Sequence, residues 1–248
     1  MKPETVRSGR GSKALNRRRL LVACGILSSL LYIAMNIFVP MRYSGYDSSS
    51  QTISELSAVG APTSTLWVVP GIVYTLLVAM FGWGIWLSGK QNAPLRAAGA
   101  FLIAYGLIGL GWPLAPMHQR EVIAAGGATI SDTMHIVFSF VTVLLMLLAI
   151  SFGAYAFGKR FRVYSIITIV LLLAFGILTS IDAPRLEANL PTPWMGVWER
   201  ICIGVYMLWA IVLSTIVLRR SKSQLKKYAK KEIEREVEFG RREKAMTE

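Results

Sequence analysis

Residues 43–67 read YSGYDSSSQTISELSAVGAPTSTLW, a polar and almost uncharged stretch that separates two long apolar runs. Thr52 is followed three residues later by Glu55, which is the spacing of a capping box, so we expect a helix to begin at about residue 53. Gly60 and the proline two residues later should end it, because glycine takes a left-handed conformation readily and proline cannot continue the ladder. The apolar face of this short amphipathic helix would carry Ile53, Leu56 and Val59.

The composition on either side of this stretch is that of a membrane protein. The 248 residues are 54% hydrophobic and only 17% charged, which is too apolar for an ordinary soluble domain. Six apolar runs have the length of transmembrane helices, namely residues 20–39, 66–87, 97–115, 134–157, 163–181 and 195–218. We therefore predict an all-α fold, an integral membrane bundle of six transmembrane helices, with the short amphipathic helix in its first outer loop. Residues 1–19 form a basic leader and residues 219–248 a charged tail.

The distribution of lysine and arginine predicts the orientation of this bundle. Of these residues, 23 lie in the leader, in the loops 88–96 and 158–162, and in the tail, whereas 4 lie on the other side. Because cytoplasmic loops carry the excess of Lys and Arg, we expect a multi-pass protein of the cytoplasmic membrane with both termini in the cytoplasm. The net charge of +13 gathers beside apolar runs, so it predicts anionic lipid headgroups as partners and no nucleic acid.

The positions of cysteine and glycine argue against cysteine-based sites and against a nucleotide-binding site. Cys24 and Cys202 should lie at opposite membrane faces and cannot pair, and the chain has no Cys-x-x-Cys motif for thiolate zinc or dithiol chemistry. The third apolar run contains Gly106-x-x-Gly109, but no strand precedes it as a nucleotide fingerprint requires. These glycines instead predict the close approach of a neighbouring helix.

Titratable residues collect on the predicted outer side, which also suits an outward-facing pocket. This side holds both histidines and seven acids: Asp47, Glu55, His118, Glu121, Asp132, His135, Asp182, Glu187 and Glu199. At the mouth of the fourth span, Asp132, His135 and Ser139 share one helix face and can point into the bundle. The pair Thr129 and Asp132 also has the spacing of a helix cap, so a purely structural role for Asp132 stays open.

Two more outer positions join this candidate pocket. Asp182 ends the fifth span, and Glu199 and Arg200 open the sixth behind two tryptophans that mark the headgroup region. We expect Arg200 to pair with Asp132 or Asp182, and a structural salt bridge is the alternative to a binding role. The candidate ligand-binding residues are Gln51, Ser54, Glu55, Asp132, His135, Ser139, Asp182, Glu199 and Arg200.

The motifs Gln51-x-Ile53-Ser54-Glu55-Leu56, Gly60-Ala61-Pro62 and Asp132-x-x-His135 resemble those of a prokaryotic membrane family called domain of unknown function 998. The resemblance covers roughly residues 20–218. It implies a six-helix integral membrane protein and no established activity.

A more distant similarity is to the membrane hydrolases grouped with alkaline ceramidases and adiponectin receptors, which use a Ser, an Asp and three His around zinc. This chain has six predicted spans rather than seven and only two histidines, so a carboxylate such as Asp182 would have to replace the third imidazole.

Two functions follow from these observations. The first is a membrane protein that needs no cofactor and whose outer polar pocket, covered by the 53–59 helix, binds or moves a lipid-like or small polar ligand. The alternative is a zinc-dependent intramembrane lipid hydrolase in which His118, His135 and Asp132 hold the metal.

Overall fold

The structure is a computed structural model that describes residues 4–245, and within this range it consists of helices and the loops that join them. The long helices are α1 (Glu4–Phe38), α2 (Ser64–Ser88), α3 (Ala93–Gly109), α5 (Ile130–Ala154), α6 (Lys159–Glu187) and α7 (Met195–Ala245). The short ones are η1 (Pro40–Arg42), η2 (Ile53–Ser57), η3 (Trp112–Leu114) and α4 (Arg120–Ala124). Within the described range, six helices are long and apolar enough to cross a membrane, as the sequence predicted.

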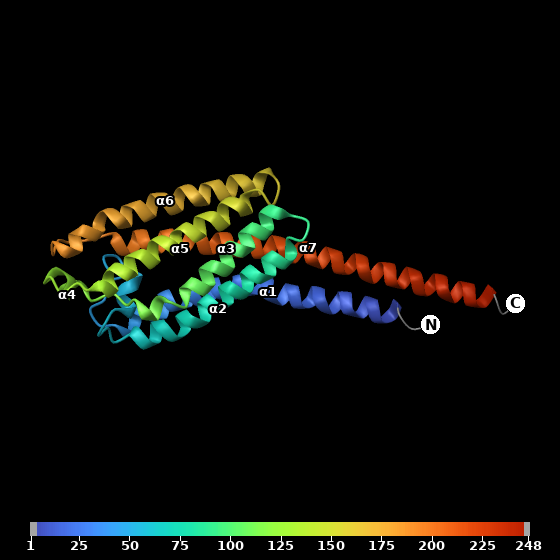
Figure 1. Ribbon diagram of the computed structural model, residues 1–248, viewed down its shortest axis with the longest axis horizontal. Helices are drawn as coiled ribbons and strands as arrows, with labels where there is room; N and C mark the ends of the chain where they lie inside the picture. The colour runs from blue at the N-terminus through green and yellow to red at the C-terminus, as the bar shows by residue number, and fades with distance from the viewer. Residues whose placement is uncertain (1–3, 246–248) are drawn as a thin grey trace.

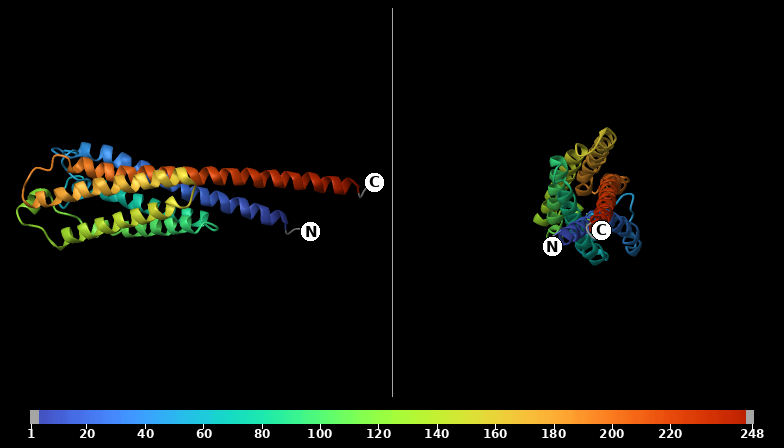
Figure 2. Two further views of the ribbon diagram at one scale, coloured as in Figure 1. Left: turned by 90° about the horizontal axis from the view of Figure 1, so that it is seen from above. Right: turned by 90° about the vertical axis from the view of Figure 1, so that its right-hand side faces the viewer.

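The six long helices form a ring in chain order (Figures 1 and 2). Each packs against the next, from α1 through α2, α3, α5 and α6 to α7, and α7 closes the ring against α1. Consecutive helices run in opposite directions. The short turns at residues 89–92 and 155–158 lie at one end of the ring, so the longer connections lie together at its other end.

Glycines allow α2 and α3 to pack closely. A Cβ atom on Gly106 would lie 2.5 Å from the backbone nitrogen of Ala79, and one on Gly99 would lie 2.5 Å from that of Trp86. Real side chains do not tolerate such distances, so these positions require glycine where the two backbones meet. The packing role predicted for Gly106 is confirmed.

Aromatic side chains fill the centre of the ring. Trp209 and Tyr206 of α7 are fully buried and stack at 6.5 Å between ring centroids. The hydroxyls of Tyr74 and Tyr105 lie 2.8 Å apart, and the indole nitrogen of Trp209 donates a hydrogen bond of 3.0 Å to Ser165 Oγ. The polar atoms of Tyr74, Tyr105 and Trp209 are thus satisfied within the apolar core.

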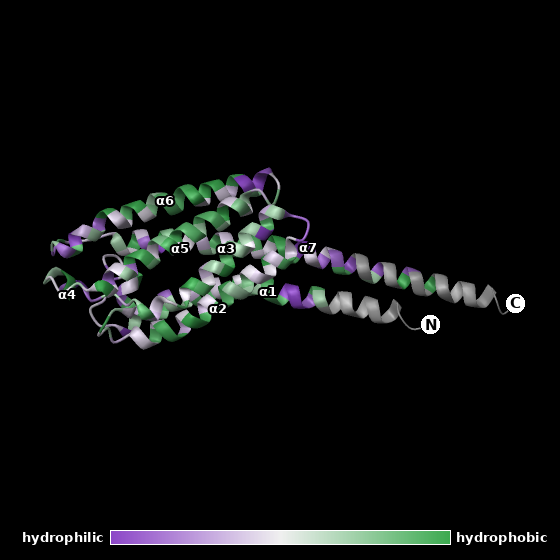
Figure 3. Cartoon of the chain, in the orientation of Figure 1, coloured by the Kyte–Doolittle hydropathy of each residue, from purple (hydrophilic) through white to green (hydrophobic). Residues whose placement is uncertain are grey.

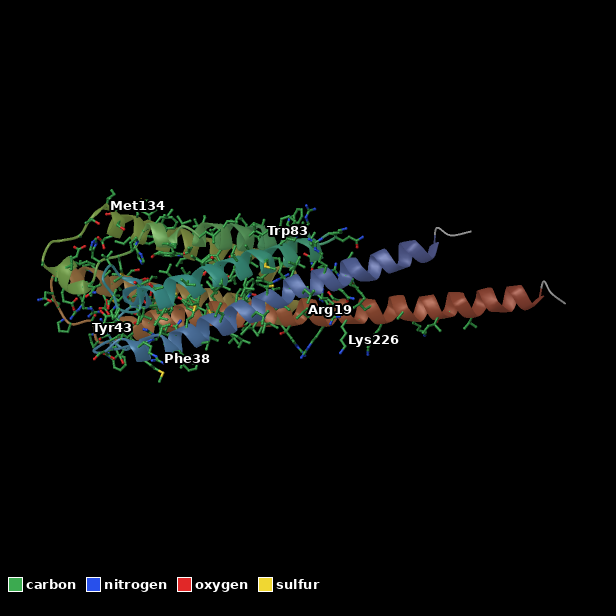
Figure 4. All side chains as sticks on the ribbon, turned by 90° about the horizontal axis from the view of Figure 1, so that it is seen from below. Arg19, Phe38, Tyr43, Trp83, Met134 and Lys226 are labelled. Atoms are coloured by element: carbon green, nitrogen blue, oxygen red, sulfur yellow. The ribbon has the colours of Figure 1, made fainter. Side chains whose placement is uncertain are left out.

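The two ends of the bundle differ in character. The loop end comprises loop 1 (residues 39–63), loop 2 (residues 110–129) and loop 3 (residues 188–194). At the basic end, α1 and α7 extend beyond the other helices, and Figure 4 shows Arg19 and Lys226 there. Hydrophilic residues gather at both ends, and the helices between them are mainly hydrophobic (Figure 3).

The short helix in loop 1 differs from the prediction. It begins at Ile53, but it is the 3₁₀ helix η2 and ends at Ser57. Thr52 makes no side-chain capping bond, and Val59 is exposed whereas Glu55 is buried, so neither the capping box nor the amphipathic face that we predicted is formed. Gly60 does take the left-handed conformation, with φ of 79°.

Candidate functional site

Loop 1 lies at the centre of the loop end and is bonded to the elements around it. The backbone nitrogen of Val59 donates to the carbonyl of Met117 in loop 2 at 2.8 Å. On the opposite side, the backbone nitrogen of Val197 in α7 donates to the carbonyl of Ser49 at 3.2 Å. These backbone bonds fix loop 1 across the mouth of the bundle, and several charged or titratable side chains reinforce them.

A buried ion pair joins loop 1 to loop 2. The Glu55 side chain is 3% exposed, and its Oε1 lies 2.8 Å from Nη2 of Arg120 and 3.2 Å from Nε. Burial raises the pKa of Glu55 above its ordinary value, and the hydrogen bonds and charge of Arg120 act in the opposite direction. Glu55 therefore binds a distant arginine, not the helix terminus that its spacing from Thr52 suggested.

Arg120 also reaches loop 3, so one side chain links all three loops. Its Nη2 donates to the carbonyl of Ser50 at 3.0 Å, and its Nη1 donates to Oγ1 of Thr192 at 3.3 Å. The buried Thr192 hydroxyl in turn donates to the Ser50 carbonyl at 3.0 Å. Neither Arg120 nor Thr192 was a candidate from the sequence. The one available signal was that only four basic residues fall on the acid-rich side, so each was a potential ion-pair partner.

His135 of α5 is buried and bridges loops 1 and 2. Its Nδ1 lies 2.8 Å from the carbonyl oxygen of Ala115, its Nε2 lies 2.9 Å from Oγ of Ser54, and its ring packs on Trp112. A carbonyl oxygen only accepts, so Nδ1 carries a proton. In the neutral ring, Nε2 then accepts the hydroxyl proton of Ser54.

Asp132 caps the start of α5 and also binds the second histidine, His118. One carboxylate oxygen accepts from the backbone nitrogen of Thr129 at 2.8 Å and lies 2.8 Å from Nδ1 of His118. The other accepts from the backbone nitrogen of His118 at 2.7 Å. The capping box of Thr129 and Asp132 is thus confirmed, and it doubles as the anchor of loop 2.

Glu199 and Arg200 of α7 hold loop 1 from the opposite side. The Glu199 carboxylate accepts the backbone N–H of Ile53, the first residue of η2. Nη1 of Arg200 donates to the carbonyls of Ser48 and Gln51 at 2.9 and 3.0 Å, and its Nη2 donates to the Tyr46 hydroxyl. The expected pairing of Arg200 with Asp132 or Asp182 is wrong, because its guanidinium instead satisfies loop carbonyls.

Tyr46 completes this contact and was not a candidate from the sequence. Its hydroxyl accepts from Arg200 and donates to the Thr52 carbonyl at 2.7 Å. Burial raises the pKa of Tyr46 to about 12, so the group stays protonated and keeps donating at physiological pH.

Three candidates have local partners of their own. The Ser139 hydroxyl donates to the carbonyl of His135, one turn earlier in its own helix. Asp182 lies 3.9 Å from Arg185 of the same helix, which is a partly exposed contact. The side chain of Gln51 accepts from the backbone of Asp47 within loop 1. The other six candidates form the cross-links between loops and helices described above, namely Ser54, Glu55, Asp132, His135, Glu199 and Arg200.

The two histidines occupy separate positions in this network. His118 bonds to Asp132, whereas both ring nitrogens of His135 are used by Ser54 and Ala115. In the part of the chain that the structure describes, no group of three or more His, Cys, Asp or Glu residues is arranged to hold a metal ion. His118, His135 and Asp132 therefore do not form the zinc centre that the hydrolase alternative requires.

Comparison with known proteins identifies the family. A family model described as "Protein of unknown function (DUF998)" matches residues 26–216, so the chain belongs to this family and the resemblance seen in its motifs is confirmed. No curated protein and no solved structure matches the chain.

Proposed function

We propose that this multi-pass membrane protein binds a lipid-like or small polar ligand at its loop end, on the outer side of the cytoplasmic membrane. The orientation rests on the excess of lysine and arginine at the basic end. The single observation that carries the proposal is the buried pair of Glu55 and Arg120, which ties all three loops together. Burying two charged groups away from water is costly, and the presence of such a pair where apolar packing would serve supports a functional role.

The chemistry of this pair suggests how a ligand would engage it. Arginine binds carboxylate and phosphate groups through two parallel hydrogen bonds, so an acidic headgroup can take the position of the Glu55 carboxylate on Arg120. The released Glu55 would then be protonated or hydrated, which its raised pKa favours. Loop 1 would loosen from loop 2 and admit the ligand beneath it.

Native mass spectrometry of purified protein tests this proposal. We expect the wild-type chain to retain a bound lipid or small molecule and Arg120→Gln to lose most of it, whereas Glu55→Gln, which removes the carboxylate that competes for Arg120, should retain it. Asp182→Asn is the matched control, because Asp182 also lies at the loop end but forms a partly exposed ion pair with Arg185 of its own helix. A wild-type protein without a bound molecule, or the same bound set in all variants, contradicts the proposal.

A second candidate function rests on the pair of Ser54 and His135. A serine hydroxyl 2.9 Å from an imidazole whose other nitrogen is held by a carbonyl is the arrangement of an activated nucleophile and its base. Ser54 is half-buried in loop 1. Its oxygen would attack an ester carbonyl while Nε2 takes the proton and returns it to the leaving alcohol. Water activated by the same imidazole would then cleave the acyl-serine.

A fluorophosphonate probe distinguishes this candidate from simple binding. Labelling of the wild type that is lost in Ser54→Ala and His135→Gln, but kept in Ser57→Ala, favours the hydrolase. Ser57 is a suitable control because its hydroxyl bonds only to the Ser54 carbonyl. Equal labelling of wild type and Ser54→Ala, or none in the wild type, rejects a nucleophilic Ser54.

A further inference from the structure

A surface groove of about 320 Å³ lies at the basic end, beside the turn that joins α2 to α3. It is lined by Trp86 and Leu87 of α2, Lys90 of the turn and Arg96 of α3. The apolar span of α2 ends at Ser88, so the groove lies where the hydrocarbon region of a membrane gives way to the headgroups. A molecule held in the groove is therefore at the depth of lipid headgroups.

The groove carries two positive charges. Lys90 and Arg96 are both exposed, and in the described part of the chain neither side chain forms an ion pair. The sequence explains this, because all seven acids between residues 5 and 231 lie at the loop end. Two neighbouring cations with no acid from the bundle beside them attract an anion from outside the protein.

Trp86 and Gly89 hold the side chain of Arg96 in the groove. The guanidinium lies over the Trp86 ring, 5.2 Å from its centroid. A Cβ atom on Gly89 would lie 2.6 Å from Cγ of Arg96, so any larger residue there would displace the arginine side chain. A stacked guanidinium keeps the N–H groups along its edge for an acceptor, and a phosphate group can accept two of them in parallel.

An exposed apolar stripe on α2 leads away from the groove along the bundle. Its members, three or four residues apart, are Val73, Leu76, Met80 and Trp83. Residues at this spacing share one helix face, and the stripe continues into Leu87 of the groove. Trp83 lies near the basic end in Figure 4, and its ring contacts that of Trp86 edge-on at 6.1 Å between centroids. A molecule with its anionic head in the groove would thus lay an apolar chain along α2.

We propose that this groove binds an anionic phospholipid, with Lys90 and Arg96 on the headgroup phosphate and the α2 stripe along an acyl chain. The two cations alone would suit any phosphate compound. The apolar stripe favours a lipid over a soluble one, and so do Trp83 and Trp86, since tryptophan is enriched at the headgroup region. The groove lies at the opposite end from loops 1, 2 and 3 and is independent of either function proposed for them.

Binding of defined lipids to the purified full chain tests this site. Native mass spectrometry gives the dissociation constant of the first bound phosphatidylglycerol, and phosphatidylcholine is the comparison without net charge. We expect Lys90→Gln and Arg96→Gln each to weaken phosphatidylglycerol binding about fivefold, because each removes one cation beside the headgroup. Arg160→Gln is the matched control, since Arg160 is exposed at the start of α6 and outside the groove, and it should change binding less than about twofold.

Two further variants separate this site from general attraction between charges. Trp86→Leu keeps both cations but removes the ring beneath Arg96, so we expect binding to weaken about threefold. Arg96→Lys keeps the charge and serves if the glutamine variants fail to fold, with a smaller loss expected than for Arg96→Gln.

Three results would overturn the proposal. One is an equal loss in Arg96→Gln and Arg160→Gln. Another is a wild-type chain that binds phosphatidylcholine as tightly as phosphatidylglycerol. The third is displacement of the bound lipid by millimolar glycerol phosphate, which would assign the groove to a soluble compound.

Discussion

The two ends of this bundle use charged side chains in opposite ways. At the loop end, Arg120 and Arg200 are engaged by groups of the protein itself, a carboxylate in one case and loop carbonyls in the other. At the basic end, three arginines lie over aromatic rings instead, namely Arg96 over Trp86, Arg162 over Tyr155 and Arg220 over Phe157. The arginines of the loop end thus hold loops in place through hydrogen bonds, whereas these three pack on neighbouring aromatic side chains.

The largest expected effect comes from breaking the buried pair at the loop end. Arg120→Gln leaves the Glu55 carboxylate buried without its cation, so we expect the free energy of unfolding to fall by about 3 kcal/mol. Denaturant unfolding in detergent micelles measures this loss. Asp182→Asn should change stability by less than about 0.5 kcal/mol, and an equal loss in both variants would contradict the distinction.

The same variant should respond to pH with a defined sign. Burial already raises the pKa of Glu55, and loss of Arg120 removes the contacts that oppose this shift. A carboxyl group whose pKa is raised on folding binds more protons in the folded state, so stability falls as pH rises from the unfolded pKa through the folded one. The deficit of Arg120→Gln should therefore be smaller at pH 5 than at pH 8. A deficit that is constant or larger at pH 5 would argue against a buried ionised Glu55.

A steric change at the loop end is expected to have the next largest effect. A Cβ atom on Gly196 would lie 2.2 Å from the carbonyl oxygen of Gln51 and 2.5 Å from that of Ser48, so Gly196→Ala pushes loop 1 away from α7. We expect a loss of about 2 kcal/mol and faster proteolysis within loop 1. Gly204→Ala is the matched control in the same helix, because its Cβ meets nothing within 4 Å. If Gly196→Ala behaves like Gly204→Ala, loop 1 is not seated on α7.

Thr192→Val should have a smaller effect. Valine keeps the shape of the side chain but removes the hydroxyl that donates to Ser50 and accepts from Arg120. We expect a loss of about 1 kcal/mol in the unfolding free energy, which is typical of a single buried hydrogen bond. Thr179→Val, which removes only a hydroxyl bonded back to its own helix, provides the comparison and should cost less.

The smallest effect is expected at the basic end. Arg160 is exposed at the start of α6, so Arg160→Gln should shift the unfolding free energy by less than about 0.5 kcal/mol. The same unfolding assay measures it. A loss as large as that of Arg120→Gln would show that charge is equally structural at both ends and would remove the contrast between them.

Local sequence patterns predicted the fold, but they did not predict which residues far apart in the sequence form pairs. The six helices, the packing of Gly106 and the cap of Asp132 each depend on residues a few positions apart, so spacing alone reveals them. Glu55 also had the spacing of a cap, but it binds Arg120, which lies 65 residues away. The guanidinium of Arg120 gives the Glu55 carboxylate several hydrogen bonds and an opposite charge, whereas a helix terminus would give it a backbone amide.

The site was therefore only partly predictable. Ser54, Glu55, Asp132, His135, Glu199 and Arg200 could be identified as polar residues at one membrane face, but their partners depend on how three loops fold over one another. Tyr46, Arg120 and Thr192 bear no motif, and their roles arise only from tertiary contacts. The predicted topology placed all of these residues at one end of the bundle, but it did not predict which of them form hydrogen bonds or ion pairs with one another.

A double-mutant cycle on Glu55 and Arg120 tests most directly whether this pair holds loop 1 to loop 2. The unfolding free energies of wild type, Glu55→Gln, Arg120→Gln and the double variant give the coupling between the two side chains. We predict a coupling of about 2 kcal/mol, with the double variant more stable than Arg120→Gln alone. A coupling below about 0.5 kcal/mol would mean that the two groups act independently and would contradict the central role of the pair.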